Sequence, residues 1–75
     1  MENVRFIDTI DGEVKCRECY DIDNGVSFLE FSLKVGYNEE FDPYEYVGEC
    51  DVINKSLSEF TNEELEDLYL QVTKP

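Results

Sequence analysis

The 75-residue chain contains no histidine and no tryptophan, and it has only six Lys and Arg residues against 19 Asp and Glu. Without histidine, the Ser-His-Asp and Cys-His nucleophile systems and the common histidine metal sites are excluded. The net charge of −13 excludes direct binding to DNA or RNA, because a nucleic-acid reader needs a basic face for the phosphates. The same charge disfavours docking on anionic lipid, which attracts clusters of Lys and Arg.

Long hydrophobic runs are also missing. The longest has three apolar residues, far fewer than the ~18 that a membrane-spanning helix needs. The N-terminal Met1-Glu2-Asn3 has neither the basic nor the apolar region of a secretory signal. The three cysteines are an odd count without a disulfide framework, which favours a reducing compartment. We therefore expect a cytoplasmic protein without membrane contact.

The apolar content predicts a folded chain in spite of the acidity. Leu, Ile, Val and Phe make up 22 of the 75 residues, above the ~20% level below which disorder is expected. Five Tyr and five Phe add large side chains to bury. The length allows one small domain over residues 1–75, whose limited core makes stabilisation by a partner or a second copy plausible.

Residues 4–35 predict a three-stranded antiparallel meander. Asp11-Gly12 is a strong two-residue hairpin signal, and residues 23–25 (Asp-Asn-Gly) supply a second turn. Alternation then assigns side chains to faces. One face of the second strand carries Val14, Cys16, Glu18, Tyr20 and Ile22, and one face of the third carries Ser27, Leu29, Phe31, Leu33 and Val35.

Residues 36–43 have turn formers and charge but no period, which predicts a loop. Residues 44–53 alternate again and predict a fourth strand, in which Gly48 is a candidate bulge position. One face would carry Tyr44, Tyr46, Gly48, Cys50 and Val52, and the other Glu45, Val47, Glu49, Asp51 and Ile53.

The C-terminal segment predicts a helix over residues 57–73. Thr61 and Glu64 have capping-box spacing, and a second box-like sequence at residues 56–59 would start the helix one turn earlier. Apolar side chains recur at i, i+3, i+4 and i+7 at positions Leu65, Leu68, Tyr69 and Val72. The fold class is therefore α+β: an antiparallel sheet of three to four strands with one C-terminal helix packed on one face.

Cys16 and Cys19 form a C-x-x-C motif, which is found in zinc and redox sites. A structural zinc site needs four ligands, and here only Cys50 and a carboxylate could complete it. Within an alternating strand, Cys16 and Cys19 face opposite sides and cannot share a metal. Ordinary packing of the cysteines is the favoured interpretation, with no metal and no cofactor. Catalysis is not expected either, because acid/base chemistry would lack histidine and a water-excluding pocket.

The acidic residues are unevenly distributed. Residues 37–75 hold 11 acidic and two basic residues, and residues 1–36 hold eight and four. The total exceeds the ~2–8 charges that suffice for solubility, and self-repulsion makes the excess costly. Duplex DNA carries a charge per ~1.7 Å, a density that this chain approaches over its own diameter. The expected partner-binding residues are Glu45, Glu49 and Asp51 on one face of the fourth strand, with Glu63, Glu66 and Asp67 on the helix.

In size, composition and predicted architecture the chain resembles the small acidic DNA-mimic inhibitor proteins of bacteriophages. The resemblance covers the whole chain but is compositional, since that group shares no motif. It implies binding and inhibition of a basic nucleic-acid-binding host protein, such as an HU-type nucleoid protein, RNA polymerase, a restriction enzyme or a CRISPR effector. It also implies residence in the host bacterial cytoplasm.

Two further expectations concern the aromatic residues. In the alternative function, an acidic adaptor regulates an enzyme through the aromatic residues of segment 41–46 without imitating DNA. Separately, one helix leaves one sheet face uncovered, and Phe28, Tyr44 and Tyr46 are candidates for that face. Pairing of two copies there would hide the apolar area, which predicts a homodimer.

Overall fold

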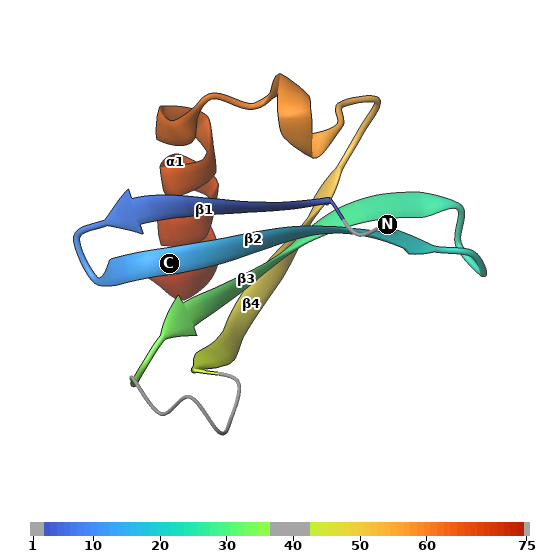
Figure 1. Cartoon of the computed structure of the whole chain (residues 1–75). Coiled ribbons are helices and arrows are strands. Elements are labelled where there is room, and N and C mark those ends of the chain that lie inside the picture. The colour runs from blue at the N-terminus through green and yellow to red at the C-terminus, as the bar shows by residue number, and fades with distance from the viewer. Residues whose placement is uncertain (1–2, 37–42, 75) are drawn as a thin grey trace.

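The strands of this protein form a meander in which each strand pairs with the next along the chain, in the order β1-β2-β3-β4 (Figure 1). The structure is a computed structural model that describes residues 3–36 and 43–74. The elements are β1 (Val4–Thr9), β2 (Gly12–Asp21), β3 (Val26–Lys34), β4 (Tyr44–Val52), the 3₁₀ turn η1 (Leu57–Glu59) and the helix α1 (Asn62–Thr73). All three pairings are antiparallel, so the predicted α+β fold is confirmed.

The two predicted hairpin turns are present. Gly12 and Gly25 have positive φ angles of 121° and 65°, which residues with a Cβ rarely adopt. The predicted meander over residues 4–35 agrees with β1 to β3, and the predicted strand over 44–53 agrees with β4. Most of the predicted loop, residues 37–42, lies outside the described residues.

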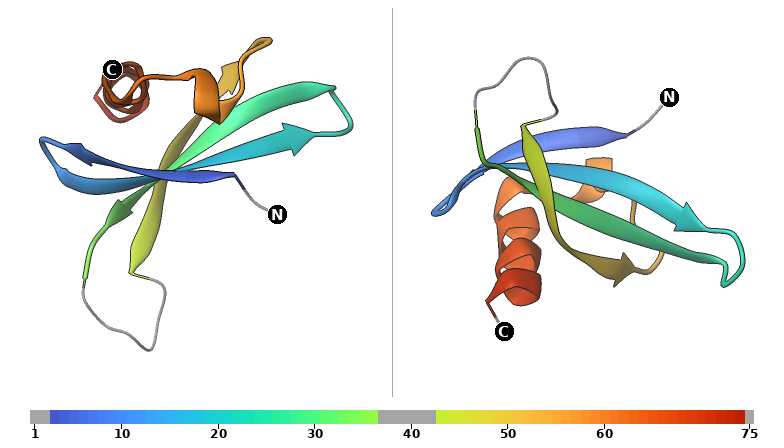
Figure 2. Two further views of the ribbon diagram at one scale, coloured as in Figure 1. Left: turned by 45° about the horizontal axis from the view of Figure 1, so that its top comes forward. Right: turned by 90° about the horizontal axis from the view of Figure 1, so that it is seen from below.

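α1 and η1 cover one face of the sheet, and the core lies between these two elements and the sheet (Figure 2). From the sheet, Ile7, Val14, Cys16, Leu29 and Phe31 are buried on this helix-covered face. From the C-terminal segment, Leu57, Leu65 and Tyr69 are buried against them. The rings of Phe31 and Tyr69 meet edge to face with centroids 6.2 Å apart, an arrangement that aromatic pairs favour.

A β-bulge at Val47 changes which β4 side chains share a face. Phe31 pairs with Gly48 and Ser32 pairs with Tyr46, so Val47 is the extra residue. Beyond the bulge the alternation is shifted by one residue. The expected common face of Tyr44, Tyr46, Gly48, Cys50 and Val52 is therefore wrong, as is that of Glu45, Glu49 and Asp51.

Packing explains why the bulge is next to Gly48. A Cβ at Gly48 would lie 3.1 Å from Cγ2 of Val72 on α1, so the helix crosses β4 where the strand has no side chain. Val47 packs against the core on the same side. The extra residue thus keeps apolar contact with α1 and turns the tyrosines at the start of β4 to the opposite face.

The predicted helix over residues 57–73 is divided in two. η1 ends at Glu59 and α1 begins at Asn62, because Phe60 and Thr61 have extended backbones with ψ angles of 140° and 162°. An N-cap residue needs this extended conformation, so Thr61 cannot also lie inside a longer helix. The second box-like sequence begins a separate 3₁₀ turn rather than the helix itself.

The other sheet face, which we call the open face, carries no described helix. Register places Cys19 there, paired with Phe28, and places Cys16 on the helix-covered face, paired with Phe31. The prediction that the two cysteines of the C-x-x-C face opposite sides is therefore confirmed. Tyr44 and Tyr46 also lie on the open face, because the bulge puts them there.

Candidate functional site

The three predicted acidic residues of the helix lie together on the outer surface of α1. Leu65 and Tyr69 are buried against the sheet. Glu63 and Asp67 are exposed and Glu66 is half-buried, at positions related by three and four residues and therefore neighbours on one side of the helix. Within residues 3–36 and 43–74, no Lys or Arg nitrogen lies within ion-pair distance of them.

All six Lys and Arg side chains have contacts elsewhere in the fold, which explains why none of them pairs with these three acidic residues of α1. Three ion pairs join Arg17 to Glu30, Lys34 to Glu13 and Lys55 to Glu64. Lys74 pairs with Asp11, Arg5 donates to backbone carbonyls, and Lys15 lies over the ring of Tyr44 at 5.4 Å.

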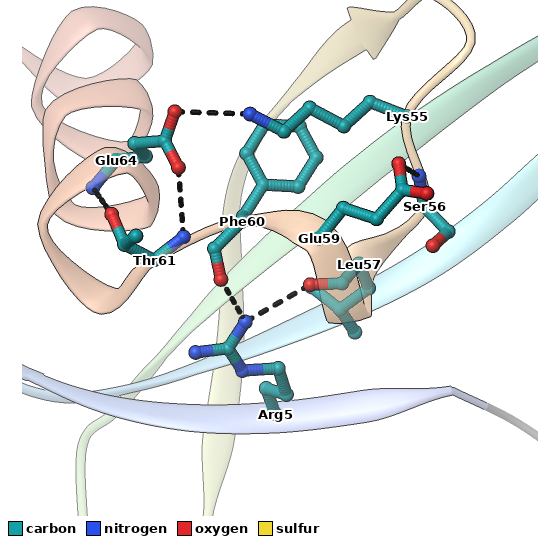
Figure 3. Close-up of polar contacts among 8 residues, drawn as sticks. All are labelled: Arg5, Lys55, Ser56, Leu57, Glu59, Phe60, Thr61 and Glu64. Carbon is teal, nitrogen blue, oxygen red and sulfur yellow. Dashed lines mark hydrogen bonds and ion pairs between the residues drawn. The ribbon is translucent and has the colours of Figure 1, made fainter.

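The start of α1 is held by a complete capping box (Figure 3). The backbone N–H of Glu64 donates to Oγ1 of Thr61 at 3.1 Å, and the N–H of Thr61 donates to Oε1 of Glu64 at 2.8 Å. Lys55 donates to the other carboxylate oxygen at 3.0 Å. The bond from the Thr61 backbone, with the Lys55 ammonium beside it, lowers the pKa of Glu64 below its usual range. Glu64 therefore has a structural role, as its position in the box predicts.

Arg5 on β1 holds the segment that leads into the helix (Figure 3). Its guanidinium donates to the carbonyl oxygen of Leu57 at 2.9 Å and also to that of Phe60. A third bond goes to the side chain of Asn62 at the first turn of α1. The carbonyl of Leu57 also accepts from the backbone N–H of Phe60 at 3.3 Å, and the charge-assisted bonds from Arg5 add to this contact and hold the carbonyl of Phe60.

The β1–β2 turn and the end of α1 are joined through Asp11, a contact that sequence analysis missed. The hydroxyl of Tyr69 donates to Oδ2 of Asp11 at 2.7 Å, and Lys74 donates to the same oxygen. The bonds from Lys74 and Tyr69 lower the pKa of Asp11 below its ordinary value. Burial, with the Asp11 carboxylate beside it, raises the pKa of Tyr69 to about 12. No local sequence signal links residues this far apart.

The three predicted acidic residues of β4 lie on two different faces. Glu49 and Asp51 lie on the open face, and Glu45 lies on the helix-covered side, where it pairs with Leu33. Oε1 of Glu49 accepts a bond from the hydroxyl of Tyr46 at 2.7 Å. A single flat partner could therefore contact α1 together with Glu45, or contact Glu49 together with Asp51, but not both sets.

Most of the six predicted residues are without a role inside the fold. Within the described part of the chain, the side chains of five of them accept no hydrogen bond and form no ion pair. Most described carboxylates elsewhere, Asp8 and Asp23 excepted, cap turns, accept hydrogen bonds or pair with cations. The five are Glu45, Asp51, Glu63, Glu66 and Asp67. These carboxylates carry charge that the fold itself does not use.

The cysteines are free thiols in settings that disfavour the thiolate. Burial raises the pKa of Cys16 to about 11, and burial also raises the pKa of Cys19 and of Cys50. Among the described residues, no group of three or more Cys, Asp or Glu side chains is arranged to hold a metal ion. No helix in the described ranges has the length and apolarity to cross a membrane.

Comparison of the chain with models of known families, with curated proteins and with solved structures gives no match. A function must therefore be argued from the surface of this chain itself.

Proposed function

We propose that this protein binds a basic nucleic-acid-binding protein and inhibits it by occupying the groove that normally holds DNA. The contact surface is the outer side of α1, defined by Glu63, Glu66 and Asp67, with Glu45 on the same side of the sheet. The observation that carries the proposal is the absence of any described hydrogen bond or ion pair at these four carboxylates, in a chain whose cations are engaged elsewhere.

Fixed charges bind an oppositely charged groove better than mobile ones, because less side-chain and backbone freedom is lost on association. The α1 carboxylates stand on a helix whose first turn is capped by Thr61 and Glu64 and tied to β1 through Arg5. Neighbouring positions on a helix have Cβ atoms about 5–6 Å apart, so the three carboxylates form a closely spaced group of negative charges, as the phosphates of a DNA strand do. The arrangement thus supports the imitation of a short stretch of phosphates.

A competition assay tests the proposal. A fluorescent DNA duplex is bound in turn to an HU-type nucleoid protein, RNA polymerase, a restriction enzyme and a CRISPR effector, and this protein is then titrated in. Displacement of DNA from at least one of them, weakening steeply between about 50 and 200 mM salt, is expected for contacts that release counterions. If this protein displaces DNA from none of the four, the proposal is overturned.

Neutral variants locate the surface. Glu63→Gln, Glu66→Gln and Asp67→Asn keep side-chain shape, and each is expected to weaken binding by about 1 kcal/mol where a partner cation is close. A matched control is Asp8→Asn with Asp23→Asn, because both are exposed and lie away from α1. If the control weakens binding as much as the α1 variants do, the contact surface is not on the helix.

The alternative function, an adaptor using aromatic residues, predicts a different outcome. Residues 41–42 of that segment lie outside the described residues, but Tyr46 is 54% exposed on the open face. An adaptor contact there would resist salt and would be lost in Tyr46→Ser, while the α1 variants would bind normally.

A further inference from the structure

The open face is unusually apolar for a surface of so acidic a protein. Phe6 and Tyr46 are each 54% exposed there, and the ring of Phe6 lies 5.7 Å from that of Tyr44. Phe28 and Val26 lie further along the same face. Figure 2 shows that α1 and η1 are both on the other side of the sheet. The placement of Phe28, Tyr44 and Tyr46 on the uncovered face agrees with the expectation from sequence.

The size of the molecule limits how a second copy could bind. Its backbone extends 35 and 25 Å along the two longest axes, and a standard interface buries about 800 Å² of accessible surface per partner. A dimer of standard size would therefore use a large part of one broad face. The helix-covered side presents the unpaired carboxylates of α1, and meeting there would bring like charges together. The open face is the remaining choice.

Charge on the open face is divided along the strands. Among the described residues at one end, two cations, Lys15 and Lys34, stand with two carboxylates, Asp8 and Glu13. Lys34 pairs with Glu13, while Lys15 lies over an aromatic ring with no described carboxylate at ion-pair distance. This end also holds Phe6, Tyr44 and Tyr46, and we call it the aromatic end.

At the other end of the face, the described part of the chain places carboxylates and no Lys or Arg at a shallow hollow of about 410 Å³. Asp21, Glu49 and Asp51 line this hollow, with Val26 and Phe28 among its walls. We call this the acidic end. Arg17 and Glu30, paired at 2.9 Å, lie between the two ends and balance each other.

We propose that two copies of this chain pair through their open faces about a two-fold axis, so that the aromatic end of each covers the acidic end of the other. In such an isologous contact, residue i meets j and j meets i. Lys15 of each copy then approaches Asp51 and Glu49 of its partner, and the aromatic side chains cover the hollow beside Phe28. In the opposite orientation the acidic ends of the two copies would face each other. That contact would bring six carboxylates together, those of Asp21, Glu49 and Asp51 from each copy.

This pairing leaves the α1 surfaces of both copies facing outward on opposite sides. Self-association through the open face does not depend on a basic partner, since it involves none of the residues of the α1 surface. The two proposals are therefore tested by different measurements. Inhibition through α1 is overturned if the protein does not compete with DNA, and pairing through the open face is overturned if the protein sediments as a monomer.

Sedimentation of the full chain at tens of micromolar tests the proposal, with a dimer as the expected species and a monomer as the result that overturns it. Lys15→Glu and Asp51→Lys should each raise the dimer Kd about tenfold or more, because each places like charges opposite one another. The double variant Lys15→Glu with Asp51→Lys restores opposite charges and should return the Kd towards that of the unchanged protein. A double variant as weak as the two changes combined would exclude this orientation.

Glu63→Lys on α1 is the matched control and should leave the Kd unchanged, since the helix lies on the other side of the sheet. Carbodiimide crosslinking gives an independent measurement on the unaltered protein. Lys15 and Asp51 of one copy are separated along the strands by about 13 Å. Cys19 is level with Asp51 through Phe28, and Cys19 follows Lys15 by four steps of ~3.3 Å. A zero-length link from Lys15 to Asp51 must therefore join two copies. Dimers crosslinked only through other residues would contradict the proposed contact.

Discussion

Arg5 and Leu57 are joined across 52 residues of sequence by a hydrogen bond from the guanidinium to the carbonyl oxygen, 2.9 Å long. The same guanidinium also reaches Phe60 and Asn62, so one side chain of β1 fixes η1, the residues after it and the first turn of α1. The acidic helix is thereby positioned by a cation from the opposite end of the chain.

Arg5→Gln should lower the free energy of unfolding by about 2 kcal/mol, because several carbonyl and amide oxygens lose a charged donor. Urea denaturation measures this loss. Arg17→Gln is the control, since the Arg17–Glu30 pair lies on the sheet surface with side chains 37% and 25% exposed, and surface pairs contribute about 0–1 kcal/mol. Equal effects of the two variants would mean that Arg5 does not hold the C-terminal segment.

Thr61→Ala should lower the free energy of unfolding by about 1 kcal/mol, because the N–H of Glu64 loses its acceptor at the start of α1. The comparison is Thr73→Ala in the last turn, where the hydroxyl only donates back to the carbonyl of Tyr69. That variant should change the denaturation midpoint little. An unchanged midpoint in Thr61→Ala would show that this residue is not the N-cap in solution.

Tyr69 should ionise well above the ordinary tyrosine pKa of 10.0 when pH is raised. Its pKa is raised to about 12 by burial and by Asp11, so the folded state disfavours the phenolate. The stability from this group is complete below the ordinary value of 10.0 and is lost as pH rises towards 12. Absorbance titration of phenolate should show a late component that Tyr69→Phe removes.

Asp11 should give the opposite dependence on pH. Its pKa is lowered by Lys74 and Tyr69, so its stabilising effect is present above the ordinary value of 3.8 and disappears as pH falls through the folded value. Asp11→Asn should therefore destabilise the protein at neutral pH and differ little from the unchanged protein in strong acid. Urea denaturation across that range measures the difference, and a constant difference would contradict the role of the charge.

Gly48→Ala should destabilise the fold by about 1 kcal/mol, because the new methyl group would lie 3.1 Å from Val72. In a Val72→Ala background the same change should cost less, which a double-mutant cycle would report as coupling between the two sites. Gly36→Ala is the control, since nothing lies within 4 Å of its added Cβ. Equal costs with and without Val72 would show that the helix does not press on β4 at this point.

Local patterns were sufficient to predict much of this structure. Alternation identified the strands, because successive side chains in a strand point to opposite faces, and it placed Cys16 and Cys19 correctly on opposite sides. The Thr61–Glu64 spacing located the start of the helix. Prediction was wrong at Val47, because an extra residue shifts the period by one and separates Glu45 from Glu49 and Asp51.

The sequence by itself determined the charge surplus, the two hairpin turns and the capping box, because each depends on residues close together in the chain or on composition alone. Only the tertiary structure decided how the charge is arranged. The bulge in β4 lies next to Gly48, where Val72 of α1 approaches the strand closely. Because the bulge shifts the alternation by one residue, it divides the acidic residues of β4 between two faces. Two charged side chains, Arg5 and Asp11, hold the C-terminal segment in place through their contacts with Leu57 and Tyr69. Such contacts join residues more than 50 positions apart, and packing rather than local preference brings them together.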